Sequence, residues 1–325
     1  MRKTLAVILA AGVVMVATGC TPTGDAAACQ PVVRSGDASV QVSATGERGS
    51  APTVSFPTPL FAKNVQTSTI SPGDGRVLTE GRVADVQASL FVGSTGELLT
   101  KTDYSPTSPL RLTVGSADSV IARAIQCQSV GSRAATVLTV TEMYGPGALD
   151  PSLGLTDDAT LVLVTDIDRS YLGKADGAAQ LLQPGFPAVV TAPNGTPGIT
   201  VPNEDPPTNL MIQKLKVGDG ATVKEGDQAV VHYTGFLWNA AGTPATVFDS
   251  SWERDQPATF LAAPMSEGET TGLVPGFAKA LIGQTVGSQV IVIIPPKFGY
   301  PEGSSPESVP AGSTMVFVFD VLGIQ

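Results

Sequence analysis

The amino-acid sequence contains two copies of one pattern, and this repeat limits the folds open to the chain more than any other feature. The stretch 73–81, Gly-Asp-Gly followed after four residues by Glu-Gly, recurs at 218–226. At the same shift of 145 residues (73 to 218), the stretch 52–57 matches 197–202. Two independent matches in one register predict two domains built on the same plan.

Later landmarks define the extent of each copy. Val130-Gly131-Ser132 matches Val286-Gly287-Ser288 at a shift of 156 residues (130 to 286), so the second copy is longer between these points. We expect a first domain, a Gly- and Ala-rich linker and a second domain over residues 37–172, 173–183 and 184–325. The Pro-rich start of the second domain contains the repeated 197–202 segment, where we predict the leading strand of that domain.

Periodicity and punctuation predict an α+β fold. Runs rich in Val, Ile, Phe and Tyr and bounded by Gly or Pro are typical of strands, and they occur at Ala229–Phe236, Gln289–Ile294 and Thr314–Leu322. Pro275–Gly283 begins with proline and ends with glycine, which predicts one short amphipathic helix. Ser119–Gln126 occupies the same place in the first copy. One helix among several strands, twice, indicates two α+β domains.

The charge of the chain excludes one large class of partners. The formal net charge is -10, the pI is near 4.6, and no Lys/Arg cluster occurs beyond Arg2-Lys3. Binding to nucleic acid needs a basic surface that displaces counterions. We therefore expect no nucleic-acid partner, and we interpret the acidity as a contribution to solubility.

Residues 1–19 have the pattern of a signal peptide. Their apolar run, Leu5–Val16, follows two basic residues and is too short for a membrane span of about 20 residues. The run leads into Ala-Thr-Gly-Cys20, which resembles the lipobox of bacterial lipoproteins and implies lipidation of Cys20. The alternative is an ordinary secretory peptide beside an unrelated cysteine. We expect an extracytoplasmic protein anchored to the cell membrane by a lipid on Cys20, with residues 20–36 as a flexible tether.

Two cysteines remain once Cys20 is set aside. Cys29 and Cys127 form an even pair in a chain expected outside the cytoplasm, so the alternatives are a disulfide between them and two unpaired thiols. With a single histidine in the chain, they argue against a zinc site with nitrogen and sulfur ligands. We expect no metal and no cofactor.

The second copy lacks the usual residues of covalent catalysis. The histidine, His232, alternates with Tyr233 along a predicted strand, so the two side chains should face opposite sides. No Gly-x-Ser-x-Gly elbow or phosphate-binding loop accompanies it, and each Gly-Asp-Gly phrase precedes a strand as a turn does. We therefore interpret His232 as structural.

Six short phrases of the second copy follow one another in a characteristic order: Val231-His-Tyr-Thr-Gly235, Val247-Phe-Asp-Ser-Ser251, Leu273-Val-Pro-Gly-Phe277, Val286-Gly-Ser288, Phe298-Gly-Tyr300 and Met315-Val-Phe-Val-Phe-Asp320. In this order they strongly resemble the FKBP-type peptidyl-prolyl cis-trans isomerases. The resemblance implies a curved antiparallel sheet wrapped around one short helix, with an apolar pocket between them.

The activity that this resemblance implies is the isomerisation of X-Pro bonds in exported proteins. The barrier to rotation, about 18 to 20 kcal/mol, comes from amide resonance. A twisted amide has lost much of that resonance and is less polar, so an apolar, water-free pocket favours it over the planar form. The implied partners are proline-containing unfolded or partly folded exported proteins and macrolide ligands of the immunosuppressant type.

Carried over position by position, the resemblance assigns the pocket residues. The prolyl ring would lie among four aromatic side chains, those of Tyr233, Phe248, Phe277 and Phe317. Phe260 would support the pocket, Leu273 and Val274 would line its entrance, and the Val274 N–H would bind a substrate carbonyl. Asp249 would be a largely buried carboxylate at the edge. The Tyr300 hydroxyl would bind the carbonyl of the residue before proline.

A few positions depart from the family pattern. Ala258 stands where well-known members carry Phe, and Ser308 stands where a branched apolar residue is common, with Val309 beside it as a substitute. These departures leave a non-catalytic proline-binding or chaperone-like lipoprotein as the alternative function. For Phe260 and Phe317, packing in the core is an equal alternative to contact with substrate.

The first copy keeps the scaffold phrases but lacks the pocket. Where the second copy has Tyr233, Phe248, Asp249, Phe277 and Tyr300, the repeat places Ala88, Leu99, Thr100, Ile121 and Tyr144. We therefore predict a catalytically silent first domain. Its role is left open among a spacer, a partner-binding surface and a chaperone-like module.

Overall fold

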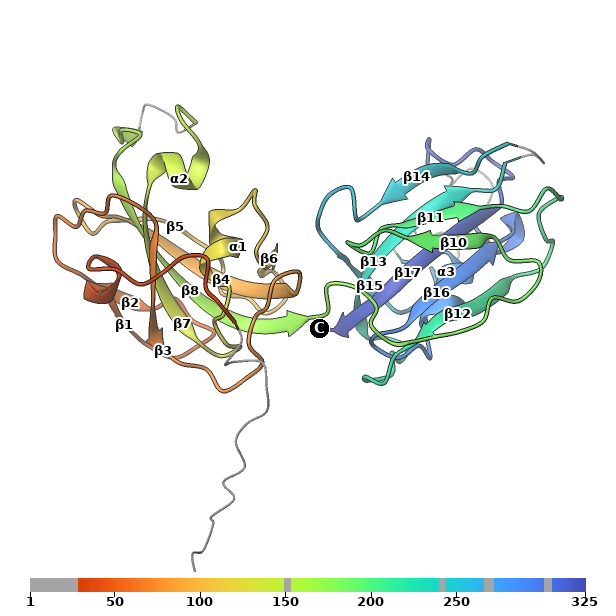
Figure 1. The fold of residues 1–325 in the computed structure, drawn as a ribbon, viewed down its shortest axis with the longest axis horizontal. Helices are drawn as coiled ribbons and strands as arrows, with labels where there is room; N and C mark the ends of the chain where they lie inside the picture. Colours follow the sequence, from red (N-terminus) through yellow and green to blue (C-terminus); the bar gives the residue numbers. More distant parts are fainter. Residues whose placement is uncertain (1–28, 149–152, 240–242, 266–271, 301–305) are drawn as a thin grey trace, which may run out of the picture.

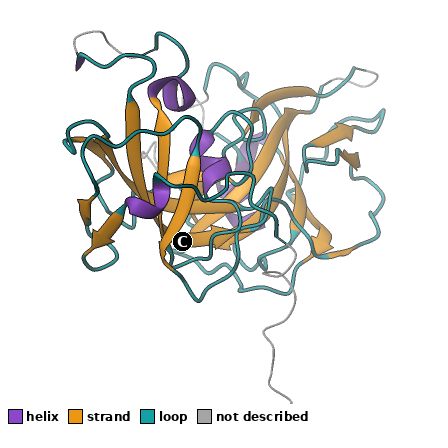
Figure 2. Ribbon diagram, turned by 60° about the vertical axis from the view of Figure 1, so that its left-hand side comes forward, coloured by secondary structure: helices purple, strands orange, loops and turns teal. Residues whose placement is uncertain are grey.

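The computed structural model describes residues 29–148, 153–239, 243–265, 272–300 and 306–325. They form two strand-rich domains that meet where the first passes into the second (Figure 1). Strands dominate and the helices are short (Figure 2), as the predicted class implies. Within the described ranges, no helix has the length and hydrophobicity needed to cross a bilayer.

The first domain is built on one antiparallel sheet. Its strand order is β3-β7-β8-β4-β5, and β6 pairs with the other end of β4. The strands are β3 (Gln66–Ser71), β4 (Val83–Val92), β5 (Leu98–Lys101), β6 (Leu110–Thr113), β7 (Arg133–Thr139) and β8 (Thr160–Tyr171).

The second domain repeats the order of this sheet and adds one edge strand, β9 (Ala178–Ala179). Its order is β9-β12-β16-β17-β13-β14, with β15 paired to the other end of β13. The strands are β12 (Met211–Val217), β13 (Gln228–Leu237), β14 (Thr246–Ser250), β15 (Ala258–Leu261), β16 (Gln289–Ile294) and β17 (Met315–Ile324). The sequence repeat therefore corresponds to a repeat of topology.

The phrases that reveal the repeat pack against each other in both domains. A Cβ atom on Gly73 would lie 2.2 Å from the carbonyl oxygen of Val130, and one on Gly218 would lie 2.1 Å from that of Val286. Only glycine permits so close an approach of two backbones. The Gly-Asp-Gly and Val-Gly-Ser phrases thus recur together because each needs the other.

Each domain packs one short helix against its sheet (Figure 1). In the first domain α1 (Val120–Ala124) begins after Ser119, whose hydroxyl accepts a hydrogen bond from the Ala122 N–H at 3.2 Å. In the second domain α3 (Pro275–Leu281) begins with proline, which fixes the backbone for the first turn. Both helices lie inside the predicted segments.

The expectation of a single helix in the first domain was wrong. A second helix, α2 (Val140–Tyr144), follows β7 directly. A capping box starts it: the Thr139 hydroxyl accepts from the Glu142 N–H, and the Glu142 carboxylate accepts from the Thr139 N–H. The corresponding place in the second domain holds the 3-10 turn η3 (Pro296–Phe298).

A two-stranded hairpin covers the outer face of each sheet. In the first domain the hairpin is β1 (Ser43–Thr45) with β2 (Thr53–Ser55), after the 3-10 turn η1 (Ser39–Gln41); in the second it is β10 (Ala188–Thr191) with β11 (Pro197–Thr200). Side chains such as Val54 and Ile199 pack over these faces. The leading strand predicted at 197–202 therefore belongs to a separate hairpin and not to the main sheet.

The first domain begins before residue 37, within the segment 20–36 that was expected to be a flexible tether. The structure joins Cys29 to Cys127 through a disulfide with a Cα–Cα distance of 5.6 Å. The Thr67 N–H of β3 also donates to the Arg34 carbonyl at 2.9 Å. Residues 29–36 are consequently part of the first domain. Cys20 and the predicted signal peptide lie outside the described residues.

The segment expected as a linker takes part in the second sheet. Within 173–183, β9 (Ala178–Ala179) pairs with the end of β12. The Ala175 N–H donates to the buried Asp320 carboxylate at 2.8 Å. These contacts attach the segment to the second domain, so it is not a free connection between two bodies.

Candidate functional site

Aromatic rings gather between the sheet and helix α3 of the second domain. The ring centroids of Phe277 and Phe317 are 5.0 Å apart, and those of Phe248 and Phe317 are 5.5 Å apart. Tyr233 and Phe260 are 5.4 Å apart. The rings come from β13, β14, β15, α3 and β17, and β17 contributes a second one, Phe319, whose centroid is 4.9 Å from that of Phe277. The structure thus brings together the aromatic residues that the sequence assigned to one pocket.

The predicted entrance residues belong to the same cluster. Leu273, Val274 and Val309 are buried, and Tyr300 packs against them partly buried. Ser308 is exposed while Val309 is 3% exposed, so Val309 occupies the apolar position. Among described residues, every predicted pocket side chain contributes to this cluster or lies at its edge.

Tyr233 carries the principal polar group of the cluster. Its hydroxyl donates to the Asp249 carboxylate and accepts a hydrogen bond from Arg254 Nη2 at 3.2 Å. Burial, together with the adjacent Asp249 carboxylate, raises the pKa of Tyr233 to about 12. The hydroxyl is therefore protonated at neutral pH and remains a donor.

Asp249 lies at the edge of the pocket with one side toward solvent. Its side chain is 37% exposed and pairs with Arg254 through an Nη1–Oδ1 distance of 2.7 Å. The expectation of a largely buried carboxylate was therefore wrong in degree, because the end of β14 leaves one side of Asp249 open. Burial and the charge of Asp249 raise the pKa of Tyr300, so Tyr300 also keeps its proton at neutral pH.

Sequence reasoning missed Arg254. It lies in the loop after β14 and is 52% exposed, yet it contacts both Asp249 and Tyr233. Its only signal is a basic residue five positions after Asp249, which no periodicity links to the site because loop geometry decides the contact.

His232 lies on the opposite side of β13 from Tyr233, as strand alternation predicts. Its Nδ1 is 2.8 Å from the Ser251 hydroxyl, and its ring stacks on Trp252 with centroids 3.9 Å apart. Burial lowers the pKa of His232 to about 4. A neutral, stacked imidazole on the far face supports its structural interpretation.

Gly235 makes room for the aromatic rings. A Cβ atom there would lie 2.6 Å from Phe248 Cζ and 2.9 Å from Phe317 Cε1. In the first domain the same ladder position belongs to Leu90, which pairs with Leu163 as Gly235 pairs with Phe317. The space open to rings in one domain is filled by leucine in the other.

The cluster that replaces the pocket in the first domain contains no aromatic side chain among the described residues. Ala88, Leu99 and Ile121 lie in or against it, and Tyr144 is 40% exposed at the end of α2. Thr100 pairs with Leu90 at the ladder position where Asp249 pairs with Gly235. The first domain thus has the scaffold without the ring-lined space.

In the part of the chain that the structure describes, no three His, Cys, Asp or Glu side chains form a group that could hold a metal ion.

Comparisons with known proteins agree with these features of the second domain. A family model of FKBP-type peptidyl-prolyl cis-trans isomerases matches residues 220–322. The chain is 34% identical over 127 residues to a probable FK506-binding protein of Corynebacterium glutamicum, covering 39% of this chain and 96% of that protein. It is 37% identical over 101 residues to peptidyl-prolyl cis-trans isomerase FKBP15-1 of Arabidopsis thaliana, covering 31% and 59% respectively.

The chain thus spans nearly the whole bacterial relative and less than two thirds of the plant one. The crystal structure of FkpA from Escherichia coli aligns with 26% identity and a TM-score of 0.30, over 44% of this chain and 53% of that one. So low a score adds nothing to the description of the fold.

Proposed function

The chain belongs to the family of FKBP-type peptidyl-prolyl cis-trans isomerases, and from this premise we propose that its second domain isomerises X-Pro bonds of exported proteins. The observation that carries the proposal is the set of aromatic rings with Tyr233 and Asp249 at its edge. Such a pocket needs no nucleophile and no metal.

The physical basis is preferential binding of the twisted amide. The prolyl ring would lie against Phe277 and Phe317, among apolar side chains. Away from water, the planar amide loses the hydrogen bonds that favour its polar resonance form, so the barrier to rotation falls. The Val274 N–H and the Tyr300 hydroxyl would hold the carbonyls on either side and keep the bond in place while it turns.

Binding without useful turnover is the second candidate. Ala258, on β15 opposite Val231, is a small side chain at the margin of the cluster. A pocket open on this side would admit proline and exclude water less completely. Macrolide ligands fit the same apolar surface, and we propose them as competitive ligands under either candidate.

Replacing Asp249 with valine is expected to reduce kcat/KM for an X-Pro peptide by about tenfold or more, since a charge-assisted hydrogen bond to Tyr233 disappears. Tyr300→Phe is expected to reduce it less, because a single neutral hydrogen bond is lost. A cis/trans assay on a short peptide measures both effects. Tyr144→Phe, at the equivalent position of the first domain, is the matched control and should leave the rate unchanged.

The enzymatic proposal fails if the wild-type chain does not accelerate isomerisation, or if Asp249→Val retains full activity. Binding of a proline peptide without acceleration would instead establish the second candidate.

We also propose export and lipid anchoring through Cys20, supported by the basic, apolar and small-residue pattern before it. Cys20→Ser is expected to move the protein from the membrane fraction to the soluble extracytoplasmic fraction, because the acyl chains that hold it are absent. Cell fractionation with an antibody measures the shift. Cys29→Ser is the control, and membrane retention of Cys20→Ser would exclude this anchor.

A further inference from the structure

One segment of the second domain carries, within it or next to its ends, residues that contact Asp249 and Tyr233. Residues 251–259, here called the crossover segment, comprise the connection between β14 and β15 together with the first two residues of β15, Ala258 and Thr259. Asp249 precedes the segment, Arg254 lies within it, and Phe260 follows it. Because Arg254 binds Asp249 and Phe260 packs on Tyr233, the path of the crossover segment affects where Arg254 and Phe260 lie. Strand pairing with Ala229 also holds Phe260.

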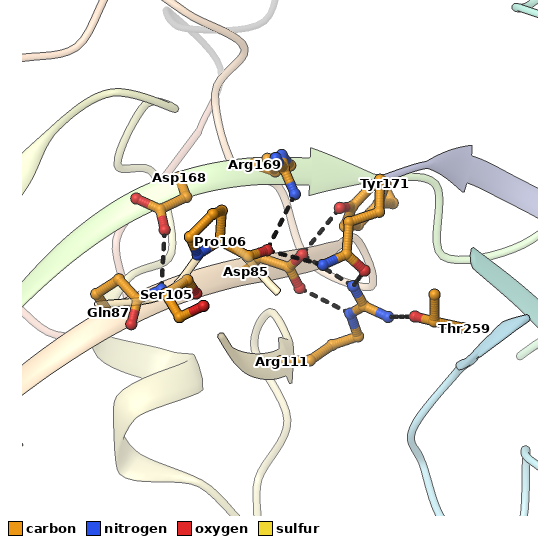
Figure 3. Close-up of polar contacts among 10 residues, drawn as sticks. Asp85, Gln87, Ser105, Pro106, Arg111, Asp168, Arg169, Tyr171 and Thr259 are labelled. Atoms are coloured by element: carbon orange, nitrogen blue, oxygen red, sulfur yellow. Dashed lines mark hydrogen bonds and ion pairs between the residues drawn. The ribbon is translucent and has the colours of Figure 1, made fainter. Parts of the chain in front are cut away.

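The first domain holds this segment at two points. Arg111 Nη1 donates to the Thr259 hydroxyl (Figure 3). The Thr113 hydroxyl donates to the Asp255 carbonyl at 3.1 Å. Asp255 has a φ of 46°, in the left-handed region that costs energy for a residue other than glycine, so the turn at this point benefits from an external hydrogen bond.

Contacts within the first domain hold the Arg111 side chain in place. Its Nε and Nη2 atoms bind the two oxygens of buried Asp85 at 2.7 and 2.8 Å. The Tyr171 hydroxyl donates to the same carboxylate at 2.8 Å (Figure 3). Arg111 Nη2 also donates to the Gln325 side chain at 3.2 Å. A guanidinium held by a bidentate pair is a rigid donor.

An apolar contact beneath these bonds keeps the domains together. Val83 and Tyr171 of the first domain form one buried cluster with Val230 and Leu322 of the second. The Leu172 N–H donates to the Leu322 carbonyl at 3.1 Å. The position of Arg111 relative to the crossover segment is therefore set by packed side chains as well as by hydrogen bonds.

We propose that the first domain is a positioning element for the site of the second, acting through Arg111 and Thr113 on the crossover segment. None of its described residues belongs to the aromatic cluster, and the corresponding cluster of its own interior, which lacks aromatic rings among those residues, is consistent with this role. By fixing the segment it holds Arg254 on Asp249 and Phe260 against Tyr233. The proposal rests on the isomerase function for its effect on rate, but not for its effect on the segment.

The test is the double variant Thr113→Val with Thr259→Val in the full-length protein. It removes both contacts with the crossover segment and leaves the buried Asp85–Arg111 pair intact, which replacement of Arg111 would not. Thr69→Val with Thr191→Val is the matched control, since both threonines are exposed on strands away from the segment.

Two measurements apply to each variant: hydrogen exchange of peptides covering 251–259, and kcat and KM for an X-Pro peptide. The loss of two ordinary hydrogen bonds is expected to speed exchange in the segment by about tenfold, with strands β16 and β17 unchanged. We expect kcat/KM to fall by about threefold to tenfold, mainly through kcat, because the rings and the carboxylate still bind proline but hold the bond less precisely.

Unchanged exchange relative to the control overturns the proposal, and so does faster exchange with unaltered kcat/KM. If the wild-type chain is inactive on every X-Pro peptide, the isomerase function fails. The exchange measurement then still decides whether the first domain orders the crossover segment.

Discussion

Gly235→Leu is expected to reduce isomerisation by about 100-fold or more, a loss of about 2.7 kcal/mol in transition-state stabilisation. Even a single Cβ atom at this position would lie 2.6 Å from Phe248 and 2.9 Å from Phe317. The leucine side chain must therefore displace both rings and occupy the position proposed for the prolyl ring. Leu90 fills the equivalent space in the first domain, which shows that the sheet itself tolerates leucine there.

The control for this variant is Gly198→Leu. Gly198 also lies in a strand of the second domain, and a Cβ atom there would meet only the Val190 carbonyl oxygen at 4.0 Å. Overpacking at Gly235 should cost about 1 to 3 kcal/mol of stability, so activity is measured well below the unfolding transition. A folded Gly235→Leu protein with wild-type activity would show that the space beside Gly235 is not the site.

The second large effect concerns pH. Burial lowers the pKa of His232 from 6.5 to about 4 and raises the pKa of Asp320 from 3.8 to about 6. Below 6.5 the unfolded chain protonates His232 while the folded chain does not, so stability is lost as pH falls. Above 3.8 the unfolded chain releases the proton of Asp320 while the folded chain keeps it, so stability is lost as pH rises.

The two effects on stability oppose each other over nearly the same pH range. His232 and Asp320 are also neighbours, since they pair across β13 and β17. In Asp320→Asn only the effect of His232 remains, so stability should fall by about 3 kcal/mol as pH falls from 6.5 to 4. In His232→Gln only the effect of Asp320 remains, so stability should fall by about 3 kcal/mol as pH rises from 3.8 to 6. In the wild type, this pair should cause little net change of unfolding free energy with pH.

Urea unfolding followed by tryptophan fluorescence measures these slopes. Trp238 and Trp252 are the two tryptophans of the chain, and both lie in the second domain, so the signal reports that domain alone. Asp219→Asn, which changes an exposed carboxylate of the same domain, is the control. Identical pH profiles for Asp320→Asn and the wild type would contradict the opposition of the two groups.

The sequence predicted the features that depend on local pattern. Strand Gln289–Ile294 has the predicted bounds, and α3 begins at the predicted Pro275, because both are marked by apolar periodicity and by proline. The rings of Tyr233, Phe277 and Phe317 lie in one cluster, as the resemblance to the isomerase family implied.

Other features depend on contacts between residues that are far apart in the chain, and local sequence pattern does not predict them. The outer hairpins could not be predicted, because the residues of segments such as 197–202 favour a strand but do not determine which sheet that strand joins. Helix α2 is an exception, because the capping-box spacing of Thr139 and Glu142 is a local signal that was missed. The hydrogen bond of Arg111 to Thr259 joins residues on two domains, and no periodicity reports it.

Under the proposed lipidation of Cys20, the disulfide at Cys29 would limit how far the folded protein can stand from a membrane. With lipid on Cys20, a free tether running to residue 36 would allow a height of roughly 55 Å, at about 3.3 to 3.6 Å per extended residue. Because Cys29 is bonded to Cys127 in the first domain, only nine residue steps remain, or roughly 30 Å. The first domain would then be confined to a thin layer above the lipid head groups, and clients would be met there rather than deep in the surrounding space.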